Sequence, residues 1–507
     1  MVERPAPVRD LDWDPERARA FTDRTADLYE ELLTKLRDLP VSRDWGTEEV
    51  RKAVSLPVPD EPMPDDELFE YLRQVTFDHS GFLGHPRFYA YISGAGTVPG
   101  AAADLLASGL NANAGGWRLA PAATEIELGF ARWFAQDVFG LPETSGGALT
   151  SGGAMANFIG LTVARDLKAG WNVRSAGVAA GPPLGLYVST ETHVVSIRAA
   201  DMLGIGWDNV RKIPVGPDYR IRMDELRARI AADREAGVHP FAVVANAGTV
   251  STGVVDPLTE IADLCRDEDL WFHVDAAYGG PAMLADDLRS LFAGIERADS
   301  IAFDPHKWMY TPQSGGCIVV RDFEDLRRAF DVEYVAYVVK DEEHTDWGVD
   351  LGRHSPNFSR GFWALKVWLS LLAHGRTAFA RRISHDAELA RYLGARVEEE
   401  PEFELMTPVG LSITCFRFVP GDLSSDGEKA GVPGRDEYLD TLNNRLMTAV
   451  QLDGRVYCSN AVLDGRFCLR TCIVNFRTEA EDLDALLDVA SELGGKLDAE
   501  LRPEELR

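Results

Sequence analysis

The sequence has few cysteines, no long apolar run and fewer basic than acidic residues. Its six cysteines are spread over the C-terminal half of 507 residues and form no C-x-x-C pair, which is typical of reduced core thiols rather than of a disulfide framework. No apolar run reaches the length of a membrane span, and the N-terminus leads directly into charged sequence. We therefore expect a cytoplasmic protein without a membrane partner.

The charge balance excludes one further class of partner. Lys and Arg total 52 against 81 Asp and Glu, giving a formal net charge of −29 that would repel nucleic acid and anionic lipid. Hydrophobic residues make up 45% and charged residues 26%, as in ordinary globular proteins. A chain of this length and composition is expected to fold into two or three packed domains around a large core.

The first 90 residues are predicted to form a helical arm. Helix-like periodicity covers residues 15–37 and 65–75, with a connector rich in proline and acid between them. Two helices with so little sequence between them cannot close a core alone, so we expect the arm to pack on a larger body or on a second copy of the chain. A homodimer follows, although a helical hairpin folded on its own chain is the alternative.

The centre of the chain alternates helical periods with short β-branched runs, the pattern of a parallel α/β sheet. We predict a large domain over residues 91–385, with strands at 186–189, 241–245, 270–274, 300–303 and 316–320. Asp256 and Pro257 are predicted to start the helix before the third of these strands. A mobile loop is expected at about 331–358 and a smaller α/β domain over 386–507.

Two residues near predicted strand ends point to a cofactor. Lys307 lies in the run Asp304-Pro305-His306-Lys307-Trp308, about 32 residues after Asp275. A lysine that can lose its proton condenses with an aldehyde, and a carboxylate can hold a proton on the nitrogen of a pyridine ring. This pair predicts pyridoxal 5′-phosphate, although Asp275 alone is equally typical of a helix cap and Lys307 of a surface amine.

A glycine-rich helix start and a histidine support the same cofactor. Residues 150–157 place Gly152 and Gly153 before a helical period, where free N–H groups attract phosphate, or where an ordinary turn is found. His193 follows a predicted strand and can stack on a flat ring, although a lone histidine is more often structural. A dinucleotide site is disfavoured because Pro99 replaces the third glycine of G-x-G-x-x-G, and no metal site is predicted.

These motifs together resemble the group II pyridoxal-phosphate decarboxylases, a family that includes aromatic-L-amino-acid and glutamate decarboxylases. The resemblance covers nearly the whole chain and extends to residues 85–91, 120–127, 360–368 and 469–470. It implies fold type I, in which a large mixed or parallel sheet holds the cofactor beside a smaller C-terminal α/β domain.

The resemblance also implies roles for individual residues. Lys307 would hold the cofactor, Asp275 would pair with its ring nitrogen, and His193 and Ala277 would cover its two faces. Gly153, Ala154 and His306 would surround the phosphate, Thr249 would approach the ring oxygen or substrate, and Tyr91 and Arg470 would contact substrate. Relatives often have Ser at the position of Ala154, so a hydroxyl contact to phosphate is missing here. Tyr337 would protonate the substrate carbon, with Tyr334 as the alternative register.

The predicted activity is decarboxylation of an L-amino acid to an amine and CO2. Aromatic or bulky apolar substrates are favoured because Gly94, Gly115 and Gly116 are expected to leave room beside Tyr91. Arg118 keeps acidic substrates of the glutamate or aspartate type as an alternative. A second alternative is an aldehyde-forming oxidative decarboxylase, since relatives with Phe at the position of Tyr337 make aldehydes. An interaction protein that keeps the fold without catalysis is the third.

Overall fold

The large domain is built on a seven-stranded mixed sheet. The computed structural model describes residues 4–5, 7–332 and 348–507. Across the sheet the strands run in the order β1-β7-β6-β5-β4-β2-β3, and only β7 is antiparallel to its neighbours. The strands are β1 (Gly146–Thr150), β2 (Leu184–Ser189), β3 (Val210–Ile213), β4 (His239–Asn246), β5 (Trp271–Asp275), β6 (Ser300–Phe303) and β7 (Gly316–Val320).

All five predicted strands are present, and the sequence reading missed the two strands at the edges of the sheet. β1 contains two glycines and β3 contains two charged residues, so neither shows the β-branched pattern of a buried strand. β1 is nevertheless fully buried because Gly147 allows the backbone of Ile318 to approach; a Cβ at this glycine would lie 2.0 Å from the Ile318 carbonyl oxygen. Because β7 is antiparallel to β1 and β6, the sheet is mixed rather than purely parallel.

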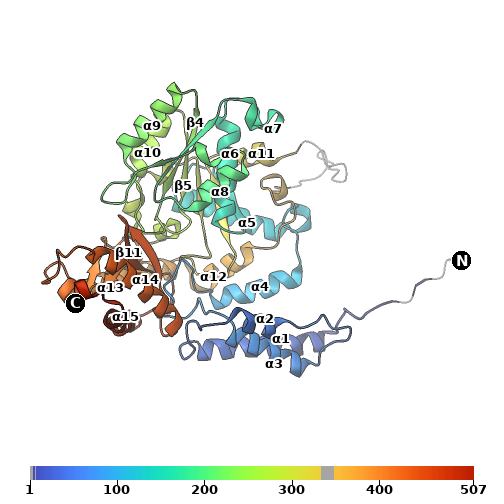
Figure 1. Cartoon of the computed structure of the whole chain (residues 1–507). Helices are drawn as coiled ribbons and strands as arrows, with labels where there is room; N and C mark the ends of the chain where they lie inside the picture. The colour runs from blue at the N-terminus through green and yellow to red at the C-terminus, as the bar shows by residue number, and fades with distance from the viewer. Residues whose placement is uncertain (1–3, 6, 333–347) are drawn as a thin grey trace.

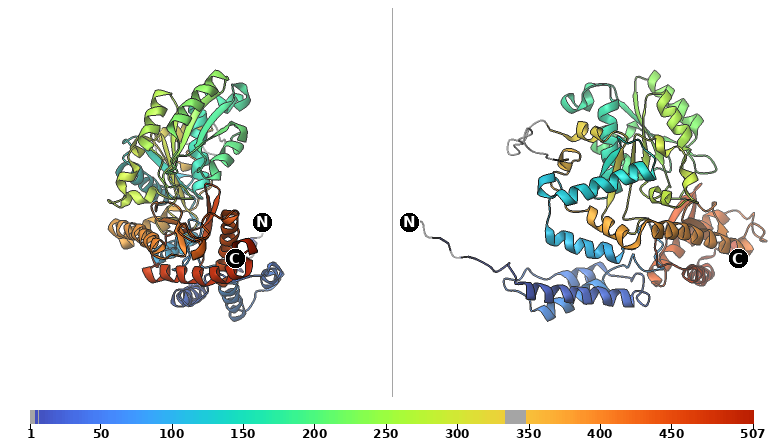
Figure 2. Two further views of the ribbon diagram at one scale, coloured as in Figure 1. Left: turned by 60° about the vertical axis from the view of Figure 1, so that its left-hand side comes forward. Right: turned by 180° about the vertical axis from the view of Figure 1, so that it is seen from behind.

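Helices cover both faces of this sheet, as the views in Figure 2 show. Alternate residues of β4 explain why: Val243 and Ala245 pack into one core, and Ala242 and Val244 into the other. The first core includes residues of α5, α9 and α10, and the second includes residues of α6 and α8. These helices are α5 (Pro121–Trp133), α6 (Gly153–Lys168), α8 (Val194–Met202), α9 (Met223–Glu235) and α10 (Leu258–Asp267).

The start of α10 corrects one prediction. Asp256 does not cap this helix, whose N-cap residue is Pro257 without a side-chain hydrogen bond. The buried Asp256 carboxylate instead accepts hydrogen bonds from the backbone N–H groups of Ile221 (2.9 Å) and Asn246 (2.8 Å). These contacts tie the end of β4 to the chain before α9, because a buried carboxylate is stabilised only where several donors surround it. The Asp256 carboxylate thus holds the backbone in place at the carboxyl end of β4.

The C-terminal region forms a second, smaller core around an antiparallel sheet. Its strand order is β10-β11-β9-β8, and α13, α14 and α15 pack on it. The elements are β8 (Phe403–Leu405), β9 (Ile413–Phe418), β10 (Ser459–Leu463), β11 (Arg466–Cys472), α13 (Arg376–Glu399), α14 (Arg435–Asp453) and α15 (Ala480–Leu501).

Helix α13 joins the two cores. Phe379, Ile383 and Ala387 from its first half belong to the core of the large sheet, while Leu393 and Val397 from its second half belong to the small one. The predicted domain boundary at 385/386 falls in the middle of this helix. A 24-residue helix is stiff, so the two sheets are held at a fixed separation along it.

The described part of the N-terminal arm contains three helices and lies beneath α4 (Val98–Leu110) in Figure 1. They are α1 (Pro15–Lys35), α2 (Thr47–Val54) and α3 (Asp65–Asp78); the sequence reading missed α2. Neither α1 nor α2 contains a buried residue, and α1 contacts α3 through Phe21 and Phe69, whose rings lie 4.9 Å apart. The arm thus has almost no core of its own.

The remaining helices connect these parts. Helix α12 (Ala364–His374) packs against α4, and α7 (Val173–Ala176) and α11 (Glu324–Phe330) pack against α6. Short single turns complete the connections. Over the described residues, no helix has both the length and the apolar character that crossing a membrane requires.

Candidate active site

The predicted chemical residues gather at one edge of the large sheet. β5 ends at Asp275, β6 ends immediately before Asp304, and β2 is followed by His193 at the start of α8. β1 runs in the same direction as these strands and leads into α6 at Gly153. Carboxyl ends of parallel strands are where ligands bind in α/β sheets, so sheet topology brings together residues separated by more than 150 positions.

Lys307 is largely buried, and its amine faces a carboxylate. Its Nζ lies 2.9 Å from Oδ2 of Asp304, three residues earlier in the same loop. Burial alone would lower the pKa of Lys307, but the carboxylates of Asp304 and Asp275 outweigh it and raise that pKa. The amine is therefore protonated at neutral pH and has a carboxylate beside it that can accept the proton before the amine reacts.

Asp275 is the second carboxylate of the site. Its Oδ1 accepts a hydrogen bond of 3.1 Å from the backbone N–H of Ala277, and among the described residues its Oδ2 has no hydrogen bond. The backbone N–H of Ala247 donates a hydrogen bond of 2.8 Å to the carbonyl oxygen of Asp275, and this bond fixes the end of the strand. An oriented carboxylate with one free oxygen suits a protonated ring nitrogen.

His193 is the N-cap residue of α8, and its Nδ1 accepts from the N–H of Val195 at 3.3 Å. This contact orients the ring. Burial lowers the pKa of His193, with Asp275 opposing and Lys307 reinforcing the change. An imidazole that stays neutral near Asp275 and Lys307 is suited to stack on a flat cofactor ring rather than to carry charge.

The start of α6 forms a cradle for an anion. Helix geometry leaves the N–H groups of Gly153 and Ala154 without acceptors inside the helix, and the helix dipole favours negative charge there. A Cβ at Gly153 would lie 2.6 Å from Oδ2 of Asp304 and 3.2 Å from Cβ of Ala277. Glycine is required at this position because both neighbours approach the backbone closely.

His306 lies beside the same cradle. Its Nδ1 is 2.5 Å from the carbonyl oxygen of Gly315, and a Cβ at Gly152 would be 3.6 Å from its Cε1. The structure therefore brings Gly153, Ala277 and His306 together around Asp304 and Lys307. Their contacts with a phosphate or a ring remain predictions.

The main residue that the sequence reading passed over is Asp304. It belongs to the lysine motif, but the motif alone predicts no role for it. Asp304 is nearly inaccessible, pairs with Lys307 and leaves Oδ1 buried with no hydrogen bond among the described residues. A carboxylate three residues before a candidate lysine is a signal that sequence alone provides, since both lie on one turn. Asp304 thus acts with Asp275 to raise the pKa of Lys307.

Thr249 lies in the loop after β4 and is buried. Its Oγ1 is 2.9 Å from Oγ1 of Thr252 and accepts from Val254 N–H at 3.2 Å. Asn246 at the strand end donates through Nδ2 to Ser189, Thr192 and Asp256 at 2.8–3.1 Å. These contacts order the loop, and the role of Thr249 toward cofactor or substrate stays a prediction.

Tyr91 and Arg470 are brought together from distant parts of the sequence. Nη1 of Arg470 donates to the Tyr91 carbonyl and to Ser459 Oγ, both at 3.1 Å. Arg470 is 3% exposed, and its Nε and Nη2 are buried without a hydrogen-bond partner among the described residues. Tyr91 has a φ of +55°, and its side chain is 59% exposed. A buried guanidinium with free donors is costly unless an anion binds to it.

The glycines expected to make room for substrate are occupied by backbone instead. A Cβ at Gly94 would lie 2.2 Å from the carbonyl oxygen of Lys307, and one at Gly115 would lie 2.0 Å from that of Phe358. At Gly116 the side chain of Leu119 is 3.4 Å away. Gly94 and Gly115 therefore permit close chain packing, and the argument that they provide space for a bulky substrate was wrong.

Two predicted residues lie outside the described part of the chain. Tyr337 and its alternative Tyr334 fall within residues 333–347. Within the described ranges, no group of three or more His, Cys, Asp or Glu side chains is placed to hold a metal ion.

The residues present fit pyridoxal 5′-phosphate. An amine, a carboxylate for a ring nitrogen, a neutral imidazole and a helix start for a phosphate all lie at one strand edge. Residues 48–419 match the family model of the pyridoxal-dependent decarboxylase conserved domain. The chain belongs to this family. It is a carboxy-lyase that uses pyridoxal 5′-phosphate, and its fold is fold type I.

Known members are similar over almost the full chain. An aromatic-L-amino-acid decarboxylase of Bacillus atrophaeus is 33% identical over 93% of this chain and 94% of its own. A phenylacetaldehyde synthase of Arabidopsis thaliana is 29% identical over 91% and 92%. The solved structure of Oryza sativa TDC with PLP and tryptamine superposes with a TM-score of 0.88 at 26% identity, covering 96% and 99% of the two chains.

Proposed function

We propose that this decarboxylase acts on an aromatic L-amino acid and releases the amine and CO2. The observation that carries the proposal is the buried cluster of Lys307, Asp304 and Asp275 beside the start of α6. The 33% identity to an aromatic-L-amino-acid decarboxylase supports the substrate class. When bound, pyridoxal 5′-phosphate supplies an electron sink for the electron pair released as the bond from Cα to the carboxylate breaks.

The residues of the chain have separate tasks in this proposal. Lys307 would hold the cofactor, and Asp304 would accept the proton at Nζ and return it. Asp275 keeps a proton on the ring nitrogen, which strengthens the pull on electrons in the transition state. His193 and Ala277 cover the two faces of the ring, while Gly153, Ala154 and His306 hold the phosphate. Thr249 contacts the ring oxygen or the substrate.

Arg470 is proposed to bind a substrate carboxylate, with Tyr91 at the same part of the pocket. Two buried nitrogens of Arg470 without partners among the described residues favour an anionic ligand. Strong pairing with the carboxylate that leaves would stabilise the ground state and oppose its loss. The same observation therefore favours a second candidate function, decarboxylation of an acidic amino acid whose side-chain carboxylate binds Arg470.

Tyr337 is proposed to donate the proton that replaces CO2 on the substrate carbon, with Tyr334 as the other register. The similarity to a phenylacetaldehyde synthase keeps aldehyde formation as an alternative outcome. If Tyr337 is the donor, Tyr337→Phe shifts products from amine toward aldehyde. An unchanged product ratio in that variant, together with a change in Tyr334→Phe, assigns the role to Tyr334.

We propose a homodimer for the working protein, located in the cytoplasm. The arm has almost no core, and apolar side chains of the neighbouring helices α4 and α12 are exposed: Leu105, Leu106 and Leu110 on α4, and Leu372 on α12. An apolar face of this kind is buried in an oligomer more often than left in water.

The three-part division at residues 90 and 385 is kept as a proposal, with α13 shared between the two larger parts.

The experiment that tests the function is mass spectrometry of products formed from single L-amino acids by cofactor-loaded protein. Tyrosine, tryptophan, phenylalanine, glutamate and aspartate form the panel, and Lys307→Ala is the control. Amine and CO2 from the aromatic acids alone support the first proposal. Amine from glutamate or aspartate supports the second, aldehyde with ammonia supports the alternative, and equal products from Lys307→Ala contradict all three.

Substitution of Arg470 distinguishes its two proposed ligands. Arg470→Met removes the charge and keeps a side chain of similar length. A rise in KM for every substrate of the panel indicates that Arg470 binds the common carboxylate, whereas a loss confined to glutamate and aspartate indicates the side-chain carboxylate. No change in either would contradict both.

A further inference from the structure

The chain directly after Lys307 turns back on itself and is held from outside the large sheet. In this segment, residues 307–310, the N–H of Tyr310 donates to the Lys307 carbonyl at 3.2 Å. Tyr310 has a φ of +52°, in the left-handed region that residues with a side chain rarely adopt because it is strained. Such a turn persists only where its side chains are fixed by tertiary contacts.

Those contacts converge on Asp386 of α13, which is inaccessible to solvent. Its Oδ2 accepts from Trp308 Nε1 at 3.0 Å and from Tyr310 Oη at 2.6 Å. Its Oδ1 accepts from Nε of Arg382, one helical turn earlier, at 2.9 Å. A carboxylate on the helix shared by the two cores thus receives hydrogen bonds from both side chains that flank the bend after Lys307.

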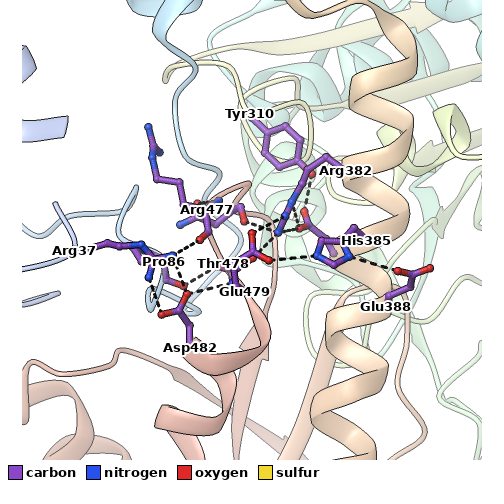
Figure 3. Close-up of polar contacts among 12 residues, drawn as sticks. Arg37, Pro86, Tyr310, Arg382, His385, Glu388, Arg477, Thr478, Glu479 and Asp482 are labelled. Carbon is purple, nitrogen blue, oxygen red and sulfur yellow. Dashed lines mark hydrogen bonds and ion pairs between the residues drawn. The ribbon is translucent and has the colours of Figure 1, made fainter. Parts of the chain in front are cut away.

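Arg382 continues the connection into the C-terminal region. Its Nη2 donates to the carbonyl oxygens of Asn475 (3.1 Å) and Thr478 (2.9 Å). Thr478 Oγ1 in turn donates to the Pro86 carbonyl at 2.6 Å. Figure 3 shows Arg382 next to Tyr310, with dashed lines that join it to the segment carrying Thr478 and Glu479. The contacts therefore link the turn at 307–310 with α13, the segment before α15 and the N-terminal region.

The Asp275 loop is fixed to the same turn. The ring of Trp308 stacks on that of Tyr278, with centroids 5.0 Å apart and planes 15° from parallel. Tyr278 follows Asp275 by three residues, and its hydroxyl lies 2.5 Å from Ser412 Oγ, just before β9. The aromatic pair of Trp308 and Tyr278 thus connects the segments that carry Lys307 and Asp275. Trp308 is hydrogen-bonded to α13, and Tyr278 is hydrogen-bonded to the residue before β9.

We propose that Asp386, with Arg382, is a positioning residue for Lys307, fixing the turn at 307–310 and thereby the direction of the cofactor lysine. Among the described residues the hydrogen bonds of Asp386 come from Trp308, Tyr310 and Arg382 and not from the lysine amine, so it acts through Trp308 and Tyr310. The proposal rests on the function of Lys307 proposed above. An amide is the sharpest substitution because its NH2 group must face either Arg382 or the Trp308 and Tyr310 donors.

Asp233 on α9 is a matched control. It is 3% exposed; its Oδ2 accepts from Tyr187 Oη (2.9 Å) and Arg211 Nε (2.8 Å), and its Oδ1 pairs with Arg229 (3.0 Å). The donors thus divide between the two oxygens as they do at Asp386. None of these residues belongs to the candidate site, so Asp233→Asn changes the same chemistry away from Lys307.

The test compares Asp386→Asn and Asp233→Asn in the cofactor-loaded protein. We expect both to lower the free energy of unfolding, but only Asp386→Asn to lower kcat by about tenfold or more with a smaller change in KM, because misplacing a reacting group mainly slows the reaction. We also expect only Asp386→Asn to move the pH midpoint of the visible band of the bound cofactor. Equal kcat values and midpoints in the two variants would overturn the proposal.

A second variant covers the case in which Asp386→Asn does not fold. Tyr310→Phe removes one hydroxyl and is compared with Tyr187→Phe by the same band and the same kcat. A shift in Tyr310→Phe alone supports the proposal, and identical spectra and rates overturn it. Absence of any cofactor band in the wild-type protein would instead overturn the role of Lys307 on which both proposals rest, so the two failures are told apart.

Discussion

Asp386 and Asp233 have similar hydrogen-bond partners, but their pKa values are shifted in opposite directions. Each carboxylate is buried and receives a tyrosine hydroxyl and an arginine. Burial raises the pKa of Asp386 to about 6, in spite of Arg382, Tyr310 and Trp308, which lower it. Burial also acts to raise the pKa of Asp233, but Arg211, Arg229 and Tyr187 outweigh it and lower that pKa. The single arginine at Asp386 does not offset the effect of burial on the pKa, whereas the two arginines at Asp233, together with Tyr187, do.

The difference follows from position in the fold. Asp233 lies on an outer helix, where Arg229 reaches it from the surface with a side chain that is 46% exposed. Asp386 lies where two cores meet, and only Arg382 is close enough to pair with it within the described residues. A site between two cores therefore keeps a carboxylate that is expensive to hold ionised. We interpret the Asp386 cluster as built for positioning rather than for stability.

Removing the arginine should produce the largest contrast. Arg382→Ala leaves Asp386 without a cation and takes from the Thr478 carbonyl the donor that Arg382 supplies, while the Asn475 carbonyl keeps the N–H of Thr478, so we expect a loss of about 3–5 kcal/mol in the free energy of unfolding. Arg211→Ala leaves Asp233 with Arg229 and Tyr187, and a loss of about 1–2 kcal/mol is expected. Urea titration of both variants measures the difference. Equal losses would mean that the two clusters are energetically alike.

The pH dependence of stability should have opposite signs at the two sites. The folded pKa of about 6 for Asp386 lies above the ordinary 3.8, so its contribution is fully present below about pH 3.8 and is lost as pH rises through 6. The stability of wild type relative to Asp386→Asn should thus fall by about 3 kcal/mol between about pH 4 and pH 7.

At Asp233 the folded pKa is lowered, so its contribution is present above 3.8 and lost as the pH falls through the folded pKa. Wild type relative to Asp233→Asn should therefore lose stability on acidification. Denaturant titrations of the three proteins at several pH values provide the measurement. Parallel pH profiles for the two aspartates would refute the contrast.

The smallest effect is expected from single hydroxyls. Tyr310→Phe and Tyr187→Phe each remove one hydrogen bond to a buried carboxylate, which should lower the free energy of unfolding by about 1–2 kcal/mol in both. The stability of the protein is then a poor guide to function, because the two variants match in stability and differ in the cofactor band. Thermal unfolding and absorbance on the same samples check this; a larger stability loss in Tyr187→Phe would go against it.

The sequence predicted the parts of the fold and site that depend on local pattern. Five buried strands, the glycine start of α6 and the strand-end positions of Asp275, His193 and Lys307 were all found from residue type and spacing. Strand β3 was missed because charged residues interrupt its apolar pattern, and α2 because its eight residues are too short for a periodic signal. Local sequence carries little information at sheet edges.

Long-range contacts could not be predicted from the sequence. Gly94 was interpreted as space for substrate, whereas the backbone of Lys307 fills that space. Asp256 looked like a helix cap, yet its partners Ile221 and Asn246 come from outside that helix. Asp386 gave no signal at all, since its partners Trp308 and Tyr310 lie more than 75 positions away. These are properties of the folded arrangement rather than of any segment.

The central claim is that Lys307 is the cofactor lysine, and borohydride reduction followed by peptide mapping tests it most directly. The reducing agent fixes the cofactor to the lysine that holds it, and mass spectrometry of the peptides locates the label. We predict a single pyridoxyl label on the peptide that contains Lys307 and none in Lys307→Ala. A label on another lysine of the wild-type protein, or an unlabelled Lys307 in protein that still releases CO2, would contradict the account.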